Sequence, residues 1–362
     1  MARPARNRDP HSVDAPTYGL DPLATATLVD GRDRGDGMFV PPLLALDRRS
    51  DRGVVSVAGT GLLTAAAAVS TRRDDLDNCV FEALASLRLL RRANPAGNLG
   101  WFSHFTDPLG NPLPFSEVST IDTALLLAGY RMLADLAAGQ IDHALHDELV
   151  AAVDDAIAAV DLGLVVRDGR ISHGFTWDGE HGEGTPQPIP HLWDDTAEGV
   201  LVYWLFGERL LAEGHRGDWW QPAIERSDYP LFVYVYPLCF EWATMPRDVA
   251  AQRTRWRDLL VDCLHEQQRR YGYVGQTATD GPDGYSVDSP TLVAPILLSA
   301  LALDESLPHV RATLRALIAR GVSPMAMNYD FDRDWTSGDT ISIDLGSAIL
   351  AEHIIRTRGR LM

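Results

Sequence analysis

The stretch "SEVSTIDTALLLAGYRML", residues 116–133, joins a helix-start signal to a long apolar run. Ser119 and Asp122 form a capping-box pattern, in which a hydroxyl at the helix start accepts a hydrogen bond from a backbone N–H three residues on. From Ile121 onward, apolar residues recur at the three- and four-residue spacing of a helix that buries one face. We therefore predict a helix over residues 120–138 that begins beside Ser119.

The same spacing recurs along most of the chain. Strand signals are few, and "LFVYVYPLCF", residues 231–240, is the main ambiguous segment. The further predicted helices cover residues 57–69, 77–92, 144–161, 194–211, 247–271, 290–302, 308–320 and 343–357. This pattern predicts an all-helical protein.

Long loops rich in Gly, Pro, Asp and aromatic residues separate these helices, after every second helix or so. Loops of this length are uncommon in compact domains and tend to carry function. A barrel of helix pairs with one elaborated rim would produce this order. Since no Gly/Ser-rich linker divides the chain, we expect a single domain over residues 38–362, preceded by an irregular arm over residues 1–37.

The net charge of the chain limits the classes of partner that it is expected to bind. With a formal net charge of −18, it would repel nucleic acid and anionic membranes, so a neutral small molecule or oligosaccharide is expected. All basic residues are arginine, which excludes a lysine Schiff base. Neither the charge nor the composition of the chain predicts its oligomeric state.

The three cysteines, Cys79, Cys239 and Cys263, are widely spaced and form no CxxC or CxxH arrangement. We predict buried, reduced thiols and neither a metal nor a cofactor. Residues 1–19 have no apolar segment typical of a signal peptide, which predicts a cytoplasmic protein.

Glu198 is the first candidate catalytic residue. In "WDDTAEGVLVYWLF", residues 193–206, helical spacing places Leu201, Val202 and Leu205 on its side of the helix. Apolar surroundings raise the pKa of a carboxyl group and suit it to act as a general acid. The alternative is a glutamate paired with an arginine, or one exposed at a helix start.

Further acids lie in the loops beside aromatic residues, a combination that suits carbohydrate. Asp122 could bind substrate, cap its helix, or both. Asp344 lies between Ile343 and Leu345 at the start of an apolar helix, so turn formation does not explain it. The P-loop, GxGxxG, HExxH and GxSxG motifs are missing, whereas glycosidases use two carboxyl groups.

In order along the chain, the blocks "SVAGTGLLTAAAAV", "GWFSHFTDPLGNP", "SEVSTIDTALLLAG", "WDDTAEGVLVYWL", "PLFVYVYP", "TATDGPDGY" and "ISIDLGSAIL" resemble the glucoamylase-like family of glycoside hydrolases. This family includes endo-β-1,2-glucanases and folds as an (α/α)6 barrel. The resemblance implies Glu198 as general acid and Asp344 as the second carboxylate. The residues expected to contact substrate are Trp101, His104, Glu117, Asp122, Trp193, Tyr234, Tyr236, Asp280, Tyr285 and Trp335.

The chain departs from the family pattern at positions expected to face the pocket. Tyr234 and Val235 stand where the family has a His and a Gln, Leu345 replaces another Gln, and Thr196 replaces a Tyr. Sugar sites lose affinity when buried hydrogen-bonding groups lack partners. The changes predict a pocket less suited to a ligand rich in hydroxyl groups.

Three functions follow. The first is a glycoside hydrolase-like enzyme acting on a β-glucan or smaller glucoside, with inversion at the anomeric carbon. The second is a repurposed barrel that acts as an intracellular cyclase or isomerase on a hydrophobic small molecule, because aromatic faces stabilise carbocations. The third is a sugar-binding protein without turnover.

Overall fold

The computed structural model describes residues 38–71, 73–94, 99–177, 184–193, 199–214, 230–241, 245, 249–286, 292–293, 307–322, 328–337 and 339–356. The predicted arm over residues 1–37 lies outside this part of the chain. Within it, helices are the main secondary structure and one hydrophobic cluster runs from Met38 to Leu350. No described helix is both long and apolar enough to cross a lipid bilayer.

Helix α2 (Val57–Ser70) lies at the centre of the first half of the fold. Its residues 57–67 are all buried, on every side of the helix. It packs most extensively against α4 (Thr120–Ala137) and α11 (Ser342–Arg356). Glycine makes this approach possible: a Cβ on Gly129 of α4 would lie 2.0 Å from the carbonyl oxygen of Gly61 in α2.

Two amphipathic helices cover α2 and α4 from outside. They are α3 (Leu76–Ala93) and α5 (His143–Ala158), which contact each other as well as α4. In α3 the buried residues Leu76, Val80, Ala83, Leu87 and Leu90 recur every three or four positions and face inward, while Phe81 is exposed. These helices agree closely with the predicted segments 77–92 and 144–161.

The described residues of the second half contain five more helices. In the ambiguous segment 231–240, residues 231–238 are helical as α8 (Leu231–Leu238). Arg253 of α9 (Val249–Tyr271) donates hydrogen bonds to the carbonyl oxygens of Pro237 and Leu238 at the end of α8. One predicted helix, 194–211, is divided at Gly207, whose φ of 44° does not fit a right-handed helix. The five helices are α6 (Val200–Phe206), α7 (Glu208–Ala212), α8 (Leu231–Leu238), α9 (Val249–Tyr271) and α10 (Leu307–Ile318).

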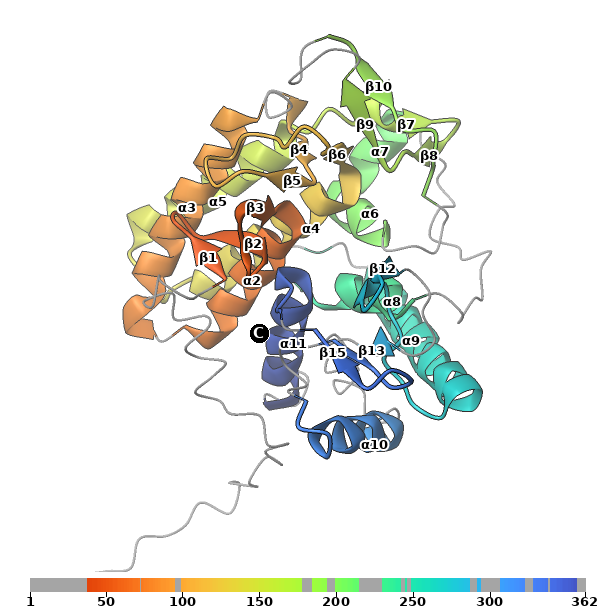
Figure 1. Cartoon of the computed structure of the whole chain (residues 1–362). Helices are drawn as coiled ribbons and strands as arrows, with labels where there is room; N and C mark the ends of the chain where they lie inside the picture. The colour runs from red at the N-terminus through yellow and green to blue at the C-terminus, as the bar shows by residue number, and fades with distance from the viewer. Residues whose placement is uncertain are drawn as a thin grey trace, which may run out of the picture.

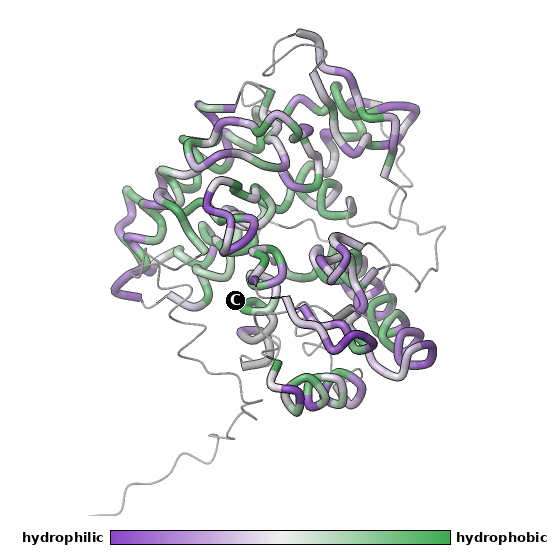
Figure 2. Tube along the Cα trace, viewed as in Figure 1, coloured by the Kyte–Doolittle hydropathy of each residue, from purple (hydrophilic) through white to green (hydrophobic). Residues whose placement is uncertain are grey.

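Figure 1 shows α2, α4, α6, α8 and α11 around the middle of the molecule and α3, α5, α9 and α10 outside them. In Figure 2, α9 and α10 have hydrophilic outer turns, whereas α2 and α4 are largely hydrophobic. The arrangement is that of inner helices screened by amphipathic outer ones.

The loops contain short antiparallel strands that the all-helical prediction missed. At two to six residues each, they are too short to show the alternation that marks a strand. Leu292 and Val293 are in a strand, so the predicted helix 290–302 is wrong there, and the rest of it lies outside the described residues.

The strands of the described residues form two four-stranded sheets and three smaller ones. The first four-stranded sheet joins β1 (Phe39–Val40), β2 (Leu44–Arg48), β3 (Asp51–Ser56) and β5 (Phe105–Thr106). The second joins β10 (Pro186–Pro188), β9 (Gly174–Trp177), β6 (Val118–Ser119) and β4 (Phe102–Ser103). The others are β7 (Val166–Arg167) with β8 (Arg170–Ile171), β11 (Thr279–Gly281) with β12 (Gly284–Ser286), and β13 (Leu292–Val293), β14 (Tyr329–Asp330) and β15 (Trp335–Thr336).

Candidate active site

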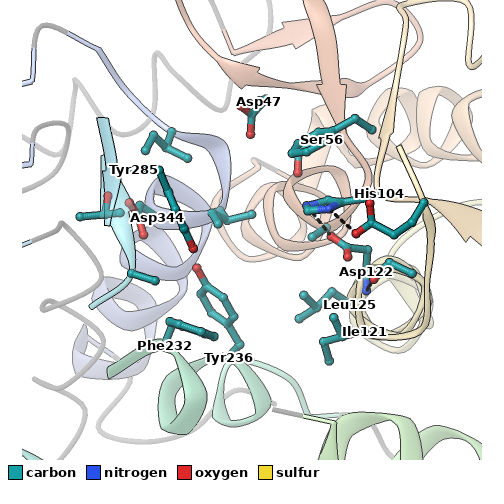
Figure 3. Close-up of a pocket in the computed structure, with 18 of the residues that line it drawn as sticks. Asp47, Ser56, His104, Ile121, Asp122, Leu125, Phe232, Tyr236, Tyr285 and Asp344 are labelled. Carbon is teal, nitrogen blue, oxygen red and sulfur yellow. Dashed lines mark hydrogen bonds and ion pairs between the residues drawn. The ribbon is translucent and has the colours of Figure 1, made fainter. Parts of the chain in front are cut away.

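A cavity of about 630 Å³ opens where the N-terminal ends of α2, α4 and α11 meet one side of α8. Figure 3 shows Ser56, His104 and Asp122 on one wall and Phe232, Tyr236, Tyr285 and Asp344 on the other. Its volume is typical of a site for a small ligand. The remaining lining residues are Asp47, Arg48, Ala58, Phe105, Glu117, Ser119, Ile121, Leu125, His173, Ile189, Trp193, Ala278, Thr279, Asp280, Ile341 and Ile343.

Helix caps fix two of these inner helices at the cavity. The hydroxyl of Ser56 accepts a hydrogen bond of 3.0 Å from the backbone N–H of Gly59 and starts α2. The hydroxyl of Ser119 accepts one of 3.3 Å from the N–H of Asp122 and starts α4, which confirms the predicted cap. Asp122 also lines the cavity, so the cap does not exclude a role in the site.

His104 lies between two carboxyl groups, one near each of its ring nitrogens. Its Nδ1 lies 3.1 Å from Glu117 Oε1 and its Nε2 lies 3.6 Å from Asp122 Oδ1. Burial lowers the pKa of His104, but the charge of Asp122 and the hydrogen bond to Glu117 outweigh it and raise that pKa to about 9. With this pKa, His104 is an imidazolium at neutral pH that donates a hydrogen bond from Nδ1 to Glu117 and forms an ion pair with Asp122 through Nε2. The hydrogen bond to His104 in turn lowers the pKa of Glu117.

Asp344 lies in the first turn of α11 and is 3% exposed. Burial, reinforced by the charges of Asp280 and Asp47, raises its pKa to about 7. Among the residues that the structure describes, no hydrogen bond or ion pair reaches its carboxyl group. A deeply buried, half-ionised carboxyl group at a cavity wall is a strong candidate for proton transfer.

Asp47 and Arg48, at the end of β2, are site residues that the sequence did not reveal. Arg48 forms an ion pair with Asp280, and its Nε lies 3.3 Å from Asp47 Oδ2. Burial raises the pKa of Asp47 although Arg48 and His104 oppose the shift. An isolated β-bridge between Arg48 and Ile341 brings β2 to the start of α11. Since this pairing joins positions far apart in the chain, no local signal predicts it.

Aromatic side chains form much of the remaining wall. Trp193 stacks on His173 with ring centroids 3.8 Å apart, and its indole N–H donates to Thr120 Oγ1 at 2.8 Å. Tyr236 and Tyr285 point toward one another in Figure 3, and Tyr285 is 67% exposed. A rigid indole face beside carboxylates suits the two sides of a sugar ring, one of C–H groups and one of hydroxyls.

No family model and no curated protein matches the sequence. Among solved structures, a "putative glucoamylase" from Bacteroides uniformis has a TM-score of 0.69 at 15% identity, covering 94% of this chain and 93% of its own.

Two endo-β-1,2-glucanases also match. The enzyme from Chitinophaga pinensis, in complex with sophorotriose and glucose, has a TM-score of 0.67 at 14% identity, over 95% of this chain and 93% of its own. The enzyme from Talaromyces funiculosus, in complex with sophorose, has a TM-score of 0.65 at 10% identity, over 94% and 87%. The chain has the fold of these glucanases.

The glucanase-like fold brings most of the predicted site residues to one cavity. The structure places these at its wall: His104, Glu117, Asp122, Trp193, Tyr236, Asp280, Tyr285 and Asp344. Glu198, the predicted acid, lies outside the described residues. Gly199, which follows it, packs closely on Trp193, since a Cβ there would lie 2.8 Å from the indole ring.

Three residues that were expected to contact substrate, Trp101, Trp335 and Tyr234, do not line this cavity. Trp101 is 0% exposed, and its indole N–H donates to the carbonyl oxygen of Asp161 at 2.8 Å. Trp335 lies in β15, paired with Asp330.

Tyr234 and Val235 are buried in the core, so the expectation that they face the pocket is wrong. The helical turn of α8 presents Phe232 and Tyr236, four residues apart, to the cavity instead.

The described residues hold no group of three or more His, Cys, Asp and Glu side chains placed to bind a metal ion. The three cysteines are buried and are not in disulfides, as predicted. Among the described residues, the cavity wall presents carboxyl groups, two histidine rings, the guanidinium of Arg48, aromatic rings and aliphatic side chains. Such a set can accept hydrogen bonds, stack on a ring and transfer protons.

Proposed function

We propose that the protein is a glycoside hydrolase-like enzyme that cleaves a β-linked glucan or glucoside by acid/base catalysis. Its architecture would be an (α/α)6 barrel, with α2, α4, α6, α8 and α11 among the inner helices and α3, α5, α9 and α10 among the outer ones. The observation that carries the proposal is the buried Asp344, whose pKa of about 7 suits a base at neutral pH, at the wall of a cavity rich in carboxyl groups.

In this proposal Asp344 removes a proton from the attacking water. Glu198 is the general acid that protonates the leaving oxygen, on the strength of its sequence context: it directly precedes Gly199, which packs on the cavity residue Trp193. The reaction would invert the anomeric centre, which requires the two carboxyl groups to stand roughly 6.5–9.5 Å apart with water between them.

The other wall residues would bind and orient the sugar. The carboxyl groups of Glu117, Asp122 and Asp280 would accept hydrogen bonds from hydroxyl groups. The hydrogen bond from His104 lowers the pKa of Glu117, whereas burial raises the pKa of Asp122 although the charge of His104 opposes the shift. Tyr285, which lines the cavity and is 67% exposed, would offer an aromatic face for stacking. Binding the ring between these groups holds the glycosidic oxygen and the water in line, which supplies much of a catalytic rate.

A second candidate is an enzyme acting on a hydrophobic small molecule. The observation that favours it is the apolar part of the wall, formed by Ala58, Ile121, Leu125, Ile189, Phe232, Ile341 and Ile343. Aromatic rings at such a wall can stabilise positive charge. In this case Asp344 would act as the proton donor.

The test is incubation of the purified protein with linear β-1,2-glucan and a panel of other glucans, with products read by mass spectrometry. Asp344→Asn and Glu198→Gln should each lower turnover at least about a hundredfold. Asp155→Asn, an exposed position on α5, is the matched control and should keep the wild-type rate. If no glucan is cleaved by folded protein, the hydrolase proposal fails and the hydrophobic substrate becomes the better proposal.

A further inference from the structure

A row of aromatic rings leads from the cavity to the molecular surface. Phe105 lines the cavity and stacks on His104, with ring centroids 3.9 Å apart and planes 17° from parallel. Phe115 follows, with its centroid 6.1 Å from that of Phe105 and its plane tilted by 53°. Phe115 is 70% exposed, so this row (His104, Phe105 and Phe115) ends at the molecular surface.

Hydrogen bonds fix the loop that carries Phe115. The Ser116 hydroxyl accepts a bond of 2.7 Å from the N–H of Phe105, and the N–H of Leu113 donates to the Phe105 carbonyl at 3.2 Å. Farther along the loop, the Asp107 carboxylate accepts from the N–H of Asn111 at 2.9 Å. The phenyl ring of Phe115 is therefore presented to solvent by a hydrogen-bonded backbone.

A single exposed phenylalanine needs no explanation. Phe81 on α3, at 66%, is an example. Phe115 differs because it continues a row whose inner rings form the cavity wall. A ligand longer than the cavity would extend to the molecular surface. There the exposed ring of Phe115, held by the hydrogen-bonded loop, would offer it an apolar face.

We infer that Phe115 forms an outer subsite, on which a sugar ring of a glucan chain stacks after the chain leaves the cavity. This inference rests on the proposed function, which it deepens by assigning the enzyme to chains rather than to short glucosides. Phenylalanine has no hydrogen-bonding group, so its contribution is the apolar area that the C–H face of the ring covers. The subsite would add affinity for length without selecting particular hydroxyl groups.

The experiment compares KM for linear β-1,2-glucan with KM for sophorotriose, a trisaccharide. In Phe115→Ala the KM for the glucan divided by the KM for the trisaccharide should rise about 5- to 10-fold. This is the loss of affinity expected when a phenyl ring that the bound ligand partly covers is removed. Phe115→Trp should restore the ratio, and Phe81→Ala is the control with matched exposure. An unchanged ratio in Phe115→Ala, or an equal loss on both substrates, would overturn the inference.

Calorimetric binding of the same polymer gives a readout that needs no turnover. Binding that weakens in Phe115→Ala but not in Phe81→Ala, without cleavage, would support the subsite and contradict the hydrolase. Cleavage with no dependence on Phe115 would support the hydrolase and contradict the subsite. If the polymer is neither bound nor cleaved, both fail. A thermal melt of Phe115→Leu beside Phe115→Ala shows whether a loss reflects misfolding.

Discussion

At Asp344, burial and the nearby negative charges both oppose ionisation of the carboxyl group. Its carboxyl group has lost hydration, while the nearby Asp280 and Asp47 make ionisation harder still. Because the pKa is raised to about 7 from an ordinary value of 3.8, the folded protein binds this proton more tightly than the unfolded chain does. The cost to stability is absent below pH about 4, grows with pH, and is complete above pH about 7.

Asp344→Asn should therefore stabilise the fold at pH 8, by at most about 4 kcal/mol, and much less at pH 5. Denaturant unfolding at the two pH values measures this. Asp155→Asn provides the exposed comparison. A variant that is less stable than the wild type at pH 8 would show that the carboxylate has a favourable partner.

The contribution of His104 to folding stability is favourable, and it also depends on pH. Its folded pKa of about 9 exceeds the ordinary value of 6.5, so its stabilisation is complete below pH about 6.5 and is lost as pH rises through about 9. We expect His104→Asn to lose about 1–2 kcal/mol at pH 6, a figure reduced for solvent screening, and much less at pH 10. A constant difference between pH 6 and 10 would assign the loss to packing rather than to charge.

Local sequence signals identified Asp344 and Asp122, because each lies at the start of an apolar helix where a carboxylate is conspicuous. They did not identify Asp47 and Arg48, since only the β-bridge between Arg48 and Ile341 brings β2 to the cavity. Trp101, which the sequence predicts as a substrate contact, does not line the cavity, and the reason is related. Its aromatic ring suggested stacking, but its position in the fold buries it against Phe206.

At the level of elements, the closest packing joins α2 to α4. A methyl group on Gly129 would lie 2.0 Å from the carbonyl oxygen of Gly61, so the two helices would have to separate. Gly129→Ala should cost about 1–3 kcal/mol or more, measured by denaturant unfolding.

Gly53→Ala is the control for this substitution, because its new Cβ has no neighbour nearer than 3.4 Å and should change stability by less than about 0.5 kcal/mol. Equal effects of the two substitutions would contradict the close approach. The periodicity predicted α2 and α4, but it does not report that they meet at glycines. The face that α8 turns to the cavity, and the short strands of the loops, likewise depend on contacts distant in sequence.

In the molecule as a whole, α11 joins the end of the fold to its beginning. It packs on α2, and its Leu345, Ala348, Ile349 and Leu350 are buried in the common core. Deleting residues 342–362 should expose the apolar surface of α2 and abolish the cooperative thermal transition, as followed by circular dichroism. A truncated chain that still melts cooperatively would mean that the first half folds by itself.

The proposed function is tested most directly by a ¹H NMR time course of linear β-1,2-glucan with the wild-type protein and with Asp344→Asn. The proposal predicts new reducing ends that appear first in the α configuration, the result of inversion, and almost none with the variant. Initial β products would contradict inversion. No new reducing ends, or equal rates for both proteins, would contradict the assignment of this cavity as a sugar-cleaving site with Asp344 at its centre.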